Sequence, residues 1–185
     1  DQNETEYKML YNASKVMDSI DYKPENSILE ELKNYADNGN YFDKVYRKFY
    51  ENYDLLKDRY PYEDLKTLIE NIYTNEFLNK VTIKWSELIA NADDMDTLPL
   101  QRNFYNKYVA GNKERLFVII SDALRYEIGV GLWHKLSEDE KCQAEIEPAL
   151  AIVPTYTQLG MAALLPHQSL EITENYKDVL VNGKQ

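Results

Sequence analysis

The sequence predicts an α/β fold that is preceded by an all-α helical region. Between residues 1 and 110, apolar side chains recur every three or four positions, which is the period of an amphipathic helix. After Gly111 the pattern changes to an uninterrupted apolar run, LFVII at Leu116 to Ile120, typical of a strand covered on both faces in a parallel sheet. We therefore expect two domains, 1–110 and 111–185.

The helical region is expected to contain four or five helices. Pro61, followed by Glu63 and Asp64, indicates a helix start, because proline fits the first turn and acidic side chains favour the positive end of the helix dipole. Asn38-Gly39-Asn40 indicates a C-cap and a turn. These signals predict separate helices over 25–37 and 41–59.

Most of the 16 tyrosines lie in this helical region. Tyr46, Tyr50 and Tyr53 follow helical spacing, which favours amphipathic packing over a ligand site, since a tyrosine ring can be buried while its hydroxyl stays polar. We find no catalytic candidate there and expect the region to act as a scaffold or to dock a partner.

The second region alternates strand and helix signals. A helical pattern through Leu124, Ile128 and Leu136 follows the first strand. A weaker strand is expected over Ala144–Val153, then a helix over Gln158–Leu165, and the stretch 180–183 reads as a strand entering a turn. Strand, helix, strand, helix is the order of an α/β domain with right-handed crossovers.

Composition excludes several functions. The net charge of −11, from 21 basic and 32 acidic residues, argues against direct nucleic-acid binding, which needs a basic surface. No apolar run or N-terminal pattern predicts a membrane span or a secretory signal. The single cysteine, Cys142, can form no internal disulfide, which fits a reducing compartment. Because the chain starts at Asp1 without an initiator Met, we expect a fragment of a longer protein.

Polar residues follow both predicted strands, at the sheet edge where reactive groups of α/β proteins gather. Asp122 brings hard oxygen ligands for a divalent cation, or it is simply a helix N-cap. Thr155 and Thr157 precede a helix whose free N–H groups would favour an alkoxide or a phosphate, or each is only a cap. His134 and His167 lack a partner motif and are expected to be surface or packing residues.

Two longer motifs carry a family resemblance. FVIISDALRYEIG (117–129) and PTYTQLGMAALLPH (154–167) resemble the PglZ-type phosphatase domain of the alkaline phosphatase superfamily, found in cytoplasmic components of bacterial BREX phage-exclusion systems. Weaker echoes in IYTNEFLNKVTIKW (72–85) and QRNFYNKYV (101–109) extend the resemblance from about residue 62 to the end. It implies the first part of an alkaline-phosphatase-like mixed sheet with flanking helices, truncated at the C-terminus.

The resemblance also implies site residues. Superfamily enzymes hold two divalent ions, usually zinc, beside a nucleophile at a helix N-terminus, so Asp122 and Thr157 are expected to be metal ligands. In sulfatases an Ala-Ala-Leu-Leu string begins five residues after the nucleophile. Counting back from Ala162 selects Thr157 over Thr155 as the catalytic nucleophile. Arg125 is a candidate substrate-binding clamp for phosphate, or it forms an ion pair with Glu127.

Two functions remain from different classes. The first is a piece of a metal-dependent phosphohydrolase or phosphodiesterase, acting in phage defence on a phosphorylated substrate. Its other metal ligands would lie beyond Gln185, so this chain alone is expected to bind metal weakly or not at all and to be inactive. The second is a non-catalytic scaffold that docks other defence-system subunits. A nucleotide-binding fold is disfavoured, because no glycine-rich phosphate loop follows either strand.

Overall fold

The computed structural model of the protein describes residues 2–92, 95, 97–174 and 177–184. The chain forms two compact units. The first unit joins residues 1–93 to 125–146, and the second joins 94–124 to 147–185. The domain boundary expected at residues 110 and 111 stays a prediction.

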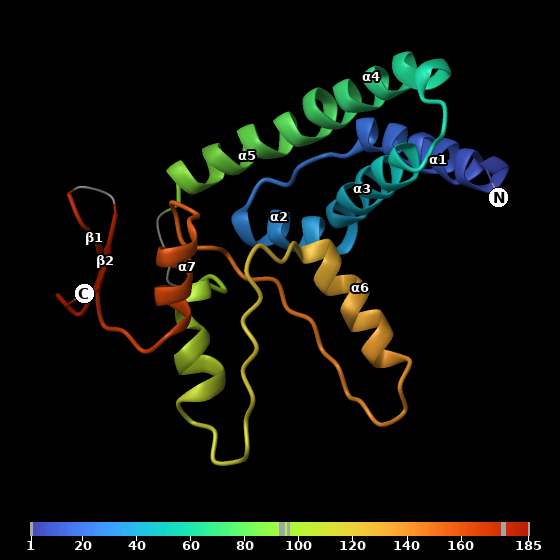
Figure 1. The fold of residues 1–185 in the computed structure, drawn as a ribbon. Helices are drawn as coiled ribbons and strands as arrows, with labels where there is room; N and C mark the ends of the chain where they lie inside the picture. Colours follow the sequence, from blue (N-terminus) through green and yellow to red (C-terminus); the bar gives the residue numbers. More distant parts are fainter. Residues whose placement is uncertain (1, 93–94, 96, 175–176, 185) are drawn as a thin grey trace. The chain divides into compact units, whose positions relative to one another are not determined.

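The first unit is helical, as the sequence predicts (Figure 1). Short 3-10 or π segments connect or extend several of its helices. Its α-helices are α1 (Gln2–Met17), α2 (Ile28–Asn34), α3 (Asn40–Asp54), α4 (Glu63–Asn71), α5 (Asn79–Ala90) and α6 (Tyr126–Ser137). The 3-10 segments are η1 (Asp18–Asp21) and η3 (Tyr60–Tyr62), and the π segments are η2 (Tyr35–Gly39) and η4 (Ile72–Leu78).

The core of the first unit lies where α1 packs against α3, with α4 and η4 closing it. Its fully buried side chains come from each of these elements: Met9, Val16, Phe49, Ile69 and Phe77. Burying each such side chain stabilises the fold by about 1.5–3 kcal/mol. The apolar residues that recur every three or four positions in the sequence are thus the ones that face this core.

The helix start at Pro61 is confirmed, because η3 contains the proline and α4 begins at Glu63. The turn predicted at Asn38–Asn40 is wrong. Gly39 has helical dihedral angles (φ −63°, ψ −38°), and α2 continues through η2 into α3. The Asn40 side chain donates to the carbonyls of Tyr35 and Ala36, and a Cβ on Gly39 would lie 2.8 Å from Tyr35 Cδ2. Gly39 is therefore favoured because its backbone lies close to the Tyr35 ring, and not because it adopts the left-handed conformation of a helix C-cap.

The tyrosine stripe packs against the core, as predicted. Tyr53 is buried, and the Tyr46 ring stacks on Tyr73 with centroids 3.7 Å apart. Many tyrosine hydroxyls of this unit donate to carboxylates. The pairs are Tyr22 with Glu31, Tyr35 and Tyr73 with Asp43, Tyr50 with Glu70, and Tyr53 with Glu63.

These tyrosines resist ionisation in the folded protein. Burial and the neighbouring carboxylates raise the pKa of Tyr22, Tyr35, Tyr50 and Tyr73. The hydrogen bond to Glu63 raises the pKa of Tyr53 to about 12. The acidic and tyrosine-rich composition of the unit thus forms several hydroxyl–carboxylate pairs, in which each hydroxyl supplies a donor that a carboxylate needs.

A buried ion pair ties α6 to the rest of the first unit. Glu127 is 2% exposed, and its two carboxylate oxygens accept from Nε and Nη2 of Arg47 on α3, at 2.7 and 2.9 Å. This bidentate geometry raises the pKa of Arg47. The pair joins helices that are far apart in the sequence.

The second unit contains less regular structure. Its helical elements are η5 (Gln101–Asn103), η6 (Tyr105–Val109) and α7 (Thr157–Leu164). Strands β1 (Leu170–Ile172) and β2 (Val179–Val181) pair antiparallel, with Glu171 opposite Leu180. The predictions of a helix over 158–165 and of a strand entering a turn at 180–183 are confirmed, since Asn182 and Gly183 adopt positive φ after β2.

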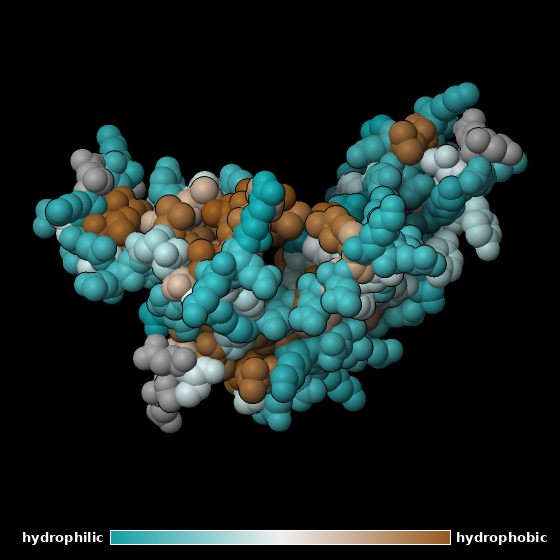
Figure 2. Space-filling view, turned by 90° about the horizontal axis from the view of Figure 1, so that it is seen from below, coloured by the Kyte–Doolittle hydropathy of each residue, from teal (hydrophilic) through white to brown (hydrophobic). Residues whose placement is uncertain are grey.

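The strands predicted at Leu116–Ile120 and Ala144–Val153 do not pair into a sheet among the described residues. Figure 1 draws 116–120 as an extended yellow tube, and Phe117 and Ile119 are 74% and 92% exposed. A parallel strand needs neighbouring strands that hydrogen-bond to its backbone N–H and C=O groups. Within the described ranges, the parallel pairing is a single bridge between Leu100 and Leu150. Figure 2 shows apolar residues at the surface on the face that it views.

No helix within the described residues combines the length and apolar character that a membrane crossing requires.

Replacing Arg47 with alanine should lower the free energy of unfolding by about 2–3 kcal/mol, because it leaves the Glu127 carboxylate buried without its partner. Lys48→Ala is the matched control. Lys48 pairs with Glu51, and both side chains are largely exposed, so its loss should cost less than about 1 kcal/mol. Urea unfolding of the two variants measures the difference; equal costs would contradict a structural role for the buried pair.

Stability should fall in alkaline solution. The folded-state pKa values of the paired tyrosines lie above their unfolded value, so their contribution is complete below about pH 10 and is lost as the pH rises further. Each proton released on unfolding steepens the loss by about 1.4 kcal/mol per pH unit. Urea midpoints at about pH 8 and about pH 11 measure this. Tyr73→Phe should flatten the pH dependence, and a midpoint independent of pH would refute the idea.

Candidate functional site

The residues singled out after the two predicted strands line one cavity of the second unit. Asp122, Thr155 and Thr157 share a cavity of about 450 Å³, and all three are exposed. Gln101, Ser121, Ile152, Tyr156 and Gly160 are among the other residues that line it. The fold thus brings together two segments that are separated in the chain by α6.

Asp122 does not cap the helix that follows it. The N-cap of α6 is Arg125, and it makes no side-chain cap bond. Directly after Asp122, Ala123 has φ of +53°, in the left-handed region that non-glycine residues seldom adopt. Such a conformation costs about 1–3 kcal/mol and concentrates at functional sites. Because Arg125 occupies the N-cap position of α6, the alternative that Asp122 is an ordinary helix N-cap is wrong.

Thr157 is the first residue of α7, and the helix N-cap is Tyr156. Tyr156 makes no side-chain cap bond, and neither threonine hydroxyl hydrogen-bonds to the first turn in the part of the chain that the structure describes. Backbone N–H groups of that turn are therefore available to an anion. Leu159, Ala162 and Ala163 are buried and hold α7 in place.

Gln101 is a positioning residue that the sequence analysis missed. Its Oε1 accepts from the Ile152 backbone at 3.1 Å, and its Nε2 donates to the Gly160 carbonyl at 3.5 Å. Its own N–H donates to the Leu150 carbonyl at 2.8 Å. One side chain thus fastens the segment before Thr155 to α7. Gln101 is the first residue of the QRNFYNKYV stretch, but apolar periodicity gives no information about the role of a single glutamine.

The Tyr156 hydroxyl is buried beside the cavity without a hydrogen-bond partner among the described residues. A buried hydroxyl left unpaired costs about 1–3 kcal/mol. A polar ligand in this cavity could supply the missing partner.

Arg125 does not line the cavity. It is exposed and belongs to the first unit, so its role as a phosphate clamp stays a prediction. Its expected ion pair with Glu127 is wrong, because both carboxylate oxygens of Glu127 accept from Arg47. His134 lies exposed beside Trp133, and Cys142 is exposed.

The cavity offers oxygen donors of the type that divalent ions prefer, the Asp122 carboxylate and the Thr157 hydroxyl. They fit such an ion in kind, but one carboxylate and one hydroxyl are fewer strong ligands than a complete site needs. Across the described ranges, no group of three or more His, Cys, Asp or Glu side chains could hold a metal ion.

Comparison with known proteins supports the resemblance found in the two motifs. Residues 102–185 match the family described as BREX system PglZ alkaline phosphatase-like domain. The chain is 37% identical over 189 residues to the alkaline phosphatase-like protein PglZ of Bacillus cereus (strain H3081.97), an alignment covering 96% of the chain. It is 39% identical over 142 residues to the alkaline phosphatase-like protein BrxZ of Escherichia coli O9:H4 (strain HS), covering 70% of the chain.

These alignments cover 22% of PglZ and 16% of BrxZ, so the chain spans about a fifth of the length of the relatives. No solved structure matches the chain. The family match includes Asp122, Thr155 and Thr157. Through residues 102–185, the chain belongs to the BREX PglZ alkaline phosphatase-like family.

Proposed function

We propose that the chain is part of a metal-dependent phosphohydrolase or phosphodiesterase that acts in bacterial phage defence. Thr157 is the nucleophile in this proposal, and Asp122 is a ligand of a divalent ion, zinc by analogy with the superfamily. The observation that carries the proposal is that both side chains line one cavity within the family-matched region.

The position of Thr157 suits attack on a phosphoryl group. Its hydroxyl lies at the N-terminus of α7, where backbone N–H groups can hold the nonbridging oxygens as negative charge builds up on them. Oγ1 forms a bond to phosphorus, the leaving group departs, and water later cleaves the phosphothreonine. A divalent ion, when bound, would lower the pKa of the hydroxyl.

The remaining metal ligands would come from the whole protein, which we propose to be longer than this chain. Three of the chain's features fit that view: the exposed Phe117 and Ile119, the unpaired extended stretch 116–120, and the alignment with only about a fifth of each relative. We propose that 116–120 and 144–153 are strands of an alkaline-phosphatase-like mixed sheet in the whole protein. The whole protein would act in the cytoplasm on a phosphorylated substrate.

A non-catalytic docking role is the second candidate, and one observation favours it. One face of α1 exposes large apolar side chains at helical spacing: Tyr7, Leu10, Tyr11 and Met17. An exposed apolar stripe of this kind is typical of a protein interaction surface. In this reading the helical unit binds another defence-system subunit, and Thr157 has no chemical task.

Thr157→Ala in the whole protein should reduce hydrolysis of an aryl phosphodiester, with Zn²⁺ added, by at least about a thousandfold, because the attacking oxygen is removed. Thr155→Ala is the matched control, a threonine of the same cavity outside α7, and should stay within about tenfold of the parent activity. Steady-state kinetics on folded variants measure both. Unchanged turnover in Thr157→Ala, with subunit binding intact, would favour the docking role instead.

The 185-residue chain alone is expected to bind Zn²⁺ weakly or not at all and to show no phosphodiester hydrolysis, because Asp122 is the one carboxylate, and no His or Cys occurs, among the described residues that line the cavity. Isothermal titration calorimetry with Zn²⁺ measures the binding. Tight binding that Asp122→Asn abolishes would show instead that this chain holds a complete metal site.

A further inference from the structure

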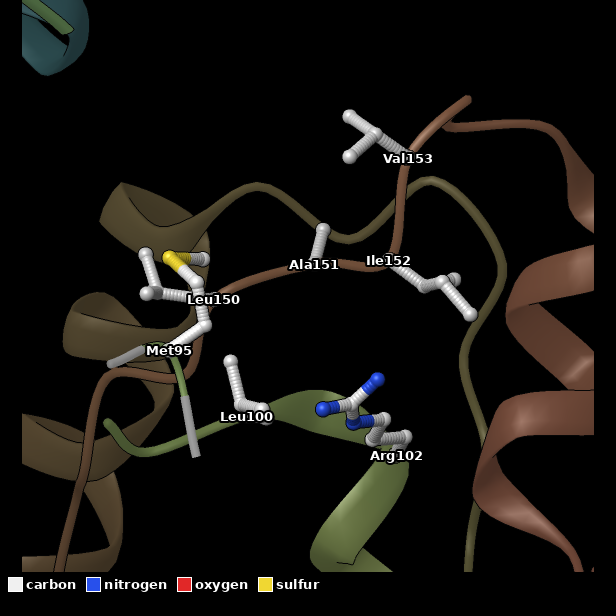
Figure 3. Close-up of a pocket in the computed structure, with 7 residues that line it drawn as sticks. All are labelled: Met95, Leu100, Arg102, Leu150, Ala151, Ile152 and Val153. Carbon is white, nitrogen blue, oxygen red and sulfur yellow. The ribbon is translucent and has the colours of Figure 1, made fainter. Parts of the chain in front are cut away.

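The segment 150–153, which leads towards the proposed nucleophile, is bordered by more than one cavity. Ala151 and Ile152 line both the cavity of the proposed nucleophile and a neighbouring cavity of about 330 Å³. Figure 3 shows this neighbouring cavity, with Leu100 on one side and the segment on the other. Ile152 also lines a third cavity, of about 310 Å³, and Val153 is 70% exposed. Apolar packing therefore leaves much of this segment uncovered and fixes its position only in part.

Hydrogen bonds to residues 99–101 hold the segment. The Leu150 N–H donates to the Pro99 carbonyl, and the Gln101 N–H donates to the Leu150 carbonyl, both at 2.8 Å. In a parallel ladder the next bond would run from the Ile152 N–H to the Gln101 carbonyl. That carbonyl instead accepts from the Phe104 N–H in η5, and the Ile152 N–H donates to Gln101 Oε1 at 3.1 Å. The Gln101 side chain thus continues the ladder where its backbone has turned away.

The same side chain also contacts α7. Its Nε2 donates to the Gly160 carbonyl at 3.5 Å, and a Cβ on Gly160 would lie 3.7 Å from this nitrogen, so the helix backbone itself lies against the amide. Ile152 and Gly160 precede and follow Thr157 in the sequence, and the Gly160 N–H donates to the Tyr156 carbonyl in the first turn of α7. Gln101 therefore binds the chain on both sides of Thr157, as acceptor before it and as donor after it.

We infer that Gln101 is a positioning residue for the proposed reaction, acting on Thr157 through Ile152 and Gly160. By holding these two backbone groups together, it fixes the Thr157 hydroxyl and the N–H groups at the start of α7 relative to the rest of the cavity. The inference rests on the proposed role of Thr157 as nucleophile. The family match begins at residue 102 and does not include Gln101.

Gln101→Met in the whole protein removes both side-chain hydrogen bonds and keeps a side chain of similar size. It should lower kcat for Zn²⁺-dependent hydrolysis of an aryl phosphodiester at least about tenfold and change KM less than about threefold, because a reacting group misplaced by about 1 Å can cost about a hundredfold in rate. Hydrogen–deuterium exchange followed by mass spectrometry should be faster in peptides that contain Ile152, since its N–H loses its acceptor.

Gln101→Glu is a second variant that distinguishes positioning from a role in folding alone. The ionised carboxylate can still accept from the Ile152 N–H but opposes the Gly160 carbonyl, whereas the protonated acid can donate to that carbonyl and restores both bonds. The ratio of its kcat to that of the parent should therefore rise as the pH falls from about 8 to about 5. A ratio that stays constant over this range would count against the inference.

Asn103→Leu is the matched control, because Asn103 is an exposed amide of η5 that does not line the Thr157 cavity. It should leave kcat and the exchange of the Ile152 peptides unchanged. Unchanged kcat in folded Gln101→Met, a rise in KM alone, or an equal loss in Asn103→Leu would each overturn the inference. Thermal melting followed by circular dichroism establishes that the variants are folded.

Thr157→Ala separates a failure of this inference from a failure of the proposed function. Full turnover in Thr157→Ala removes the nucleophile assignment and, with it, the role of Gln101. Loss of turnover in Thr157→Ala together with parental kcat in Gln101→Met keeps the nucleophile and overturns the positioning role alone.

Discussion

The ion pair between Arg47 and Glu127 is a buried contact that joins the two parts of the helical unit. This unit is discontinuous in sequence, because residues 94–124 leave it before α6 returns to it. A carboxylate that is almost fully buried needs a partner, and Arg47 supplies a bidentate one from α3. The pair therefore anchors α6 within the helical unit.

A few backbone and side-chain hydrogen bonds organise the second unit, and its sheet consists of two short strands, β1 and β2. Leu100 and Leu150 form a parallel bridge, and Gln101 extends the contact to Ile152 and Gly160. Cavities with different chemistry surround this junction. One holds the candidate nucleophile and metal ligand, and another is lined mainly by polar side chains. Ile152 lines both, so the segment before Thr155 positions residues of each.

Local sequence signals predicted much of the helical architecture. Helix periodicity, Pro61 and the tyrosine spacing are short-range features, and the structure bears them out. The prediction failed at Asn38–Asn40, because close packing of Gly39 against Tyr35 keeps the backbone helical where a local rule expects a cap. The prediction of a paired strand at 116–120 also failed among the described residues. A parallel strand depends on hydrogen bonds to neighbouring strands that are distant in the sequence.

For the site, the sequence by itself determined the residue types and their motifs: an aspartate after an apolar run, and a threonine before the Ala-Ala-Leu-Leu helix. Those motifs sufficed for the family, because motif order and spacing survive in the linear chain. Only the tertiary structure decided that Asp122 and Thr157 line one cavity, that Gln101 fastens its wall, and that Glu127 belongs to Arg47. The reason is physical: these relations join segments far apart in the chain, and no local pattern encodes which distant partner a buried polar group will find.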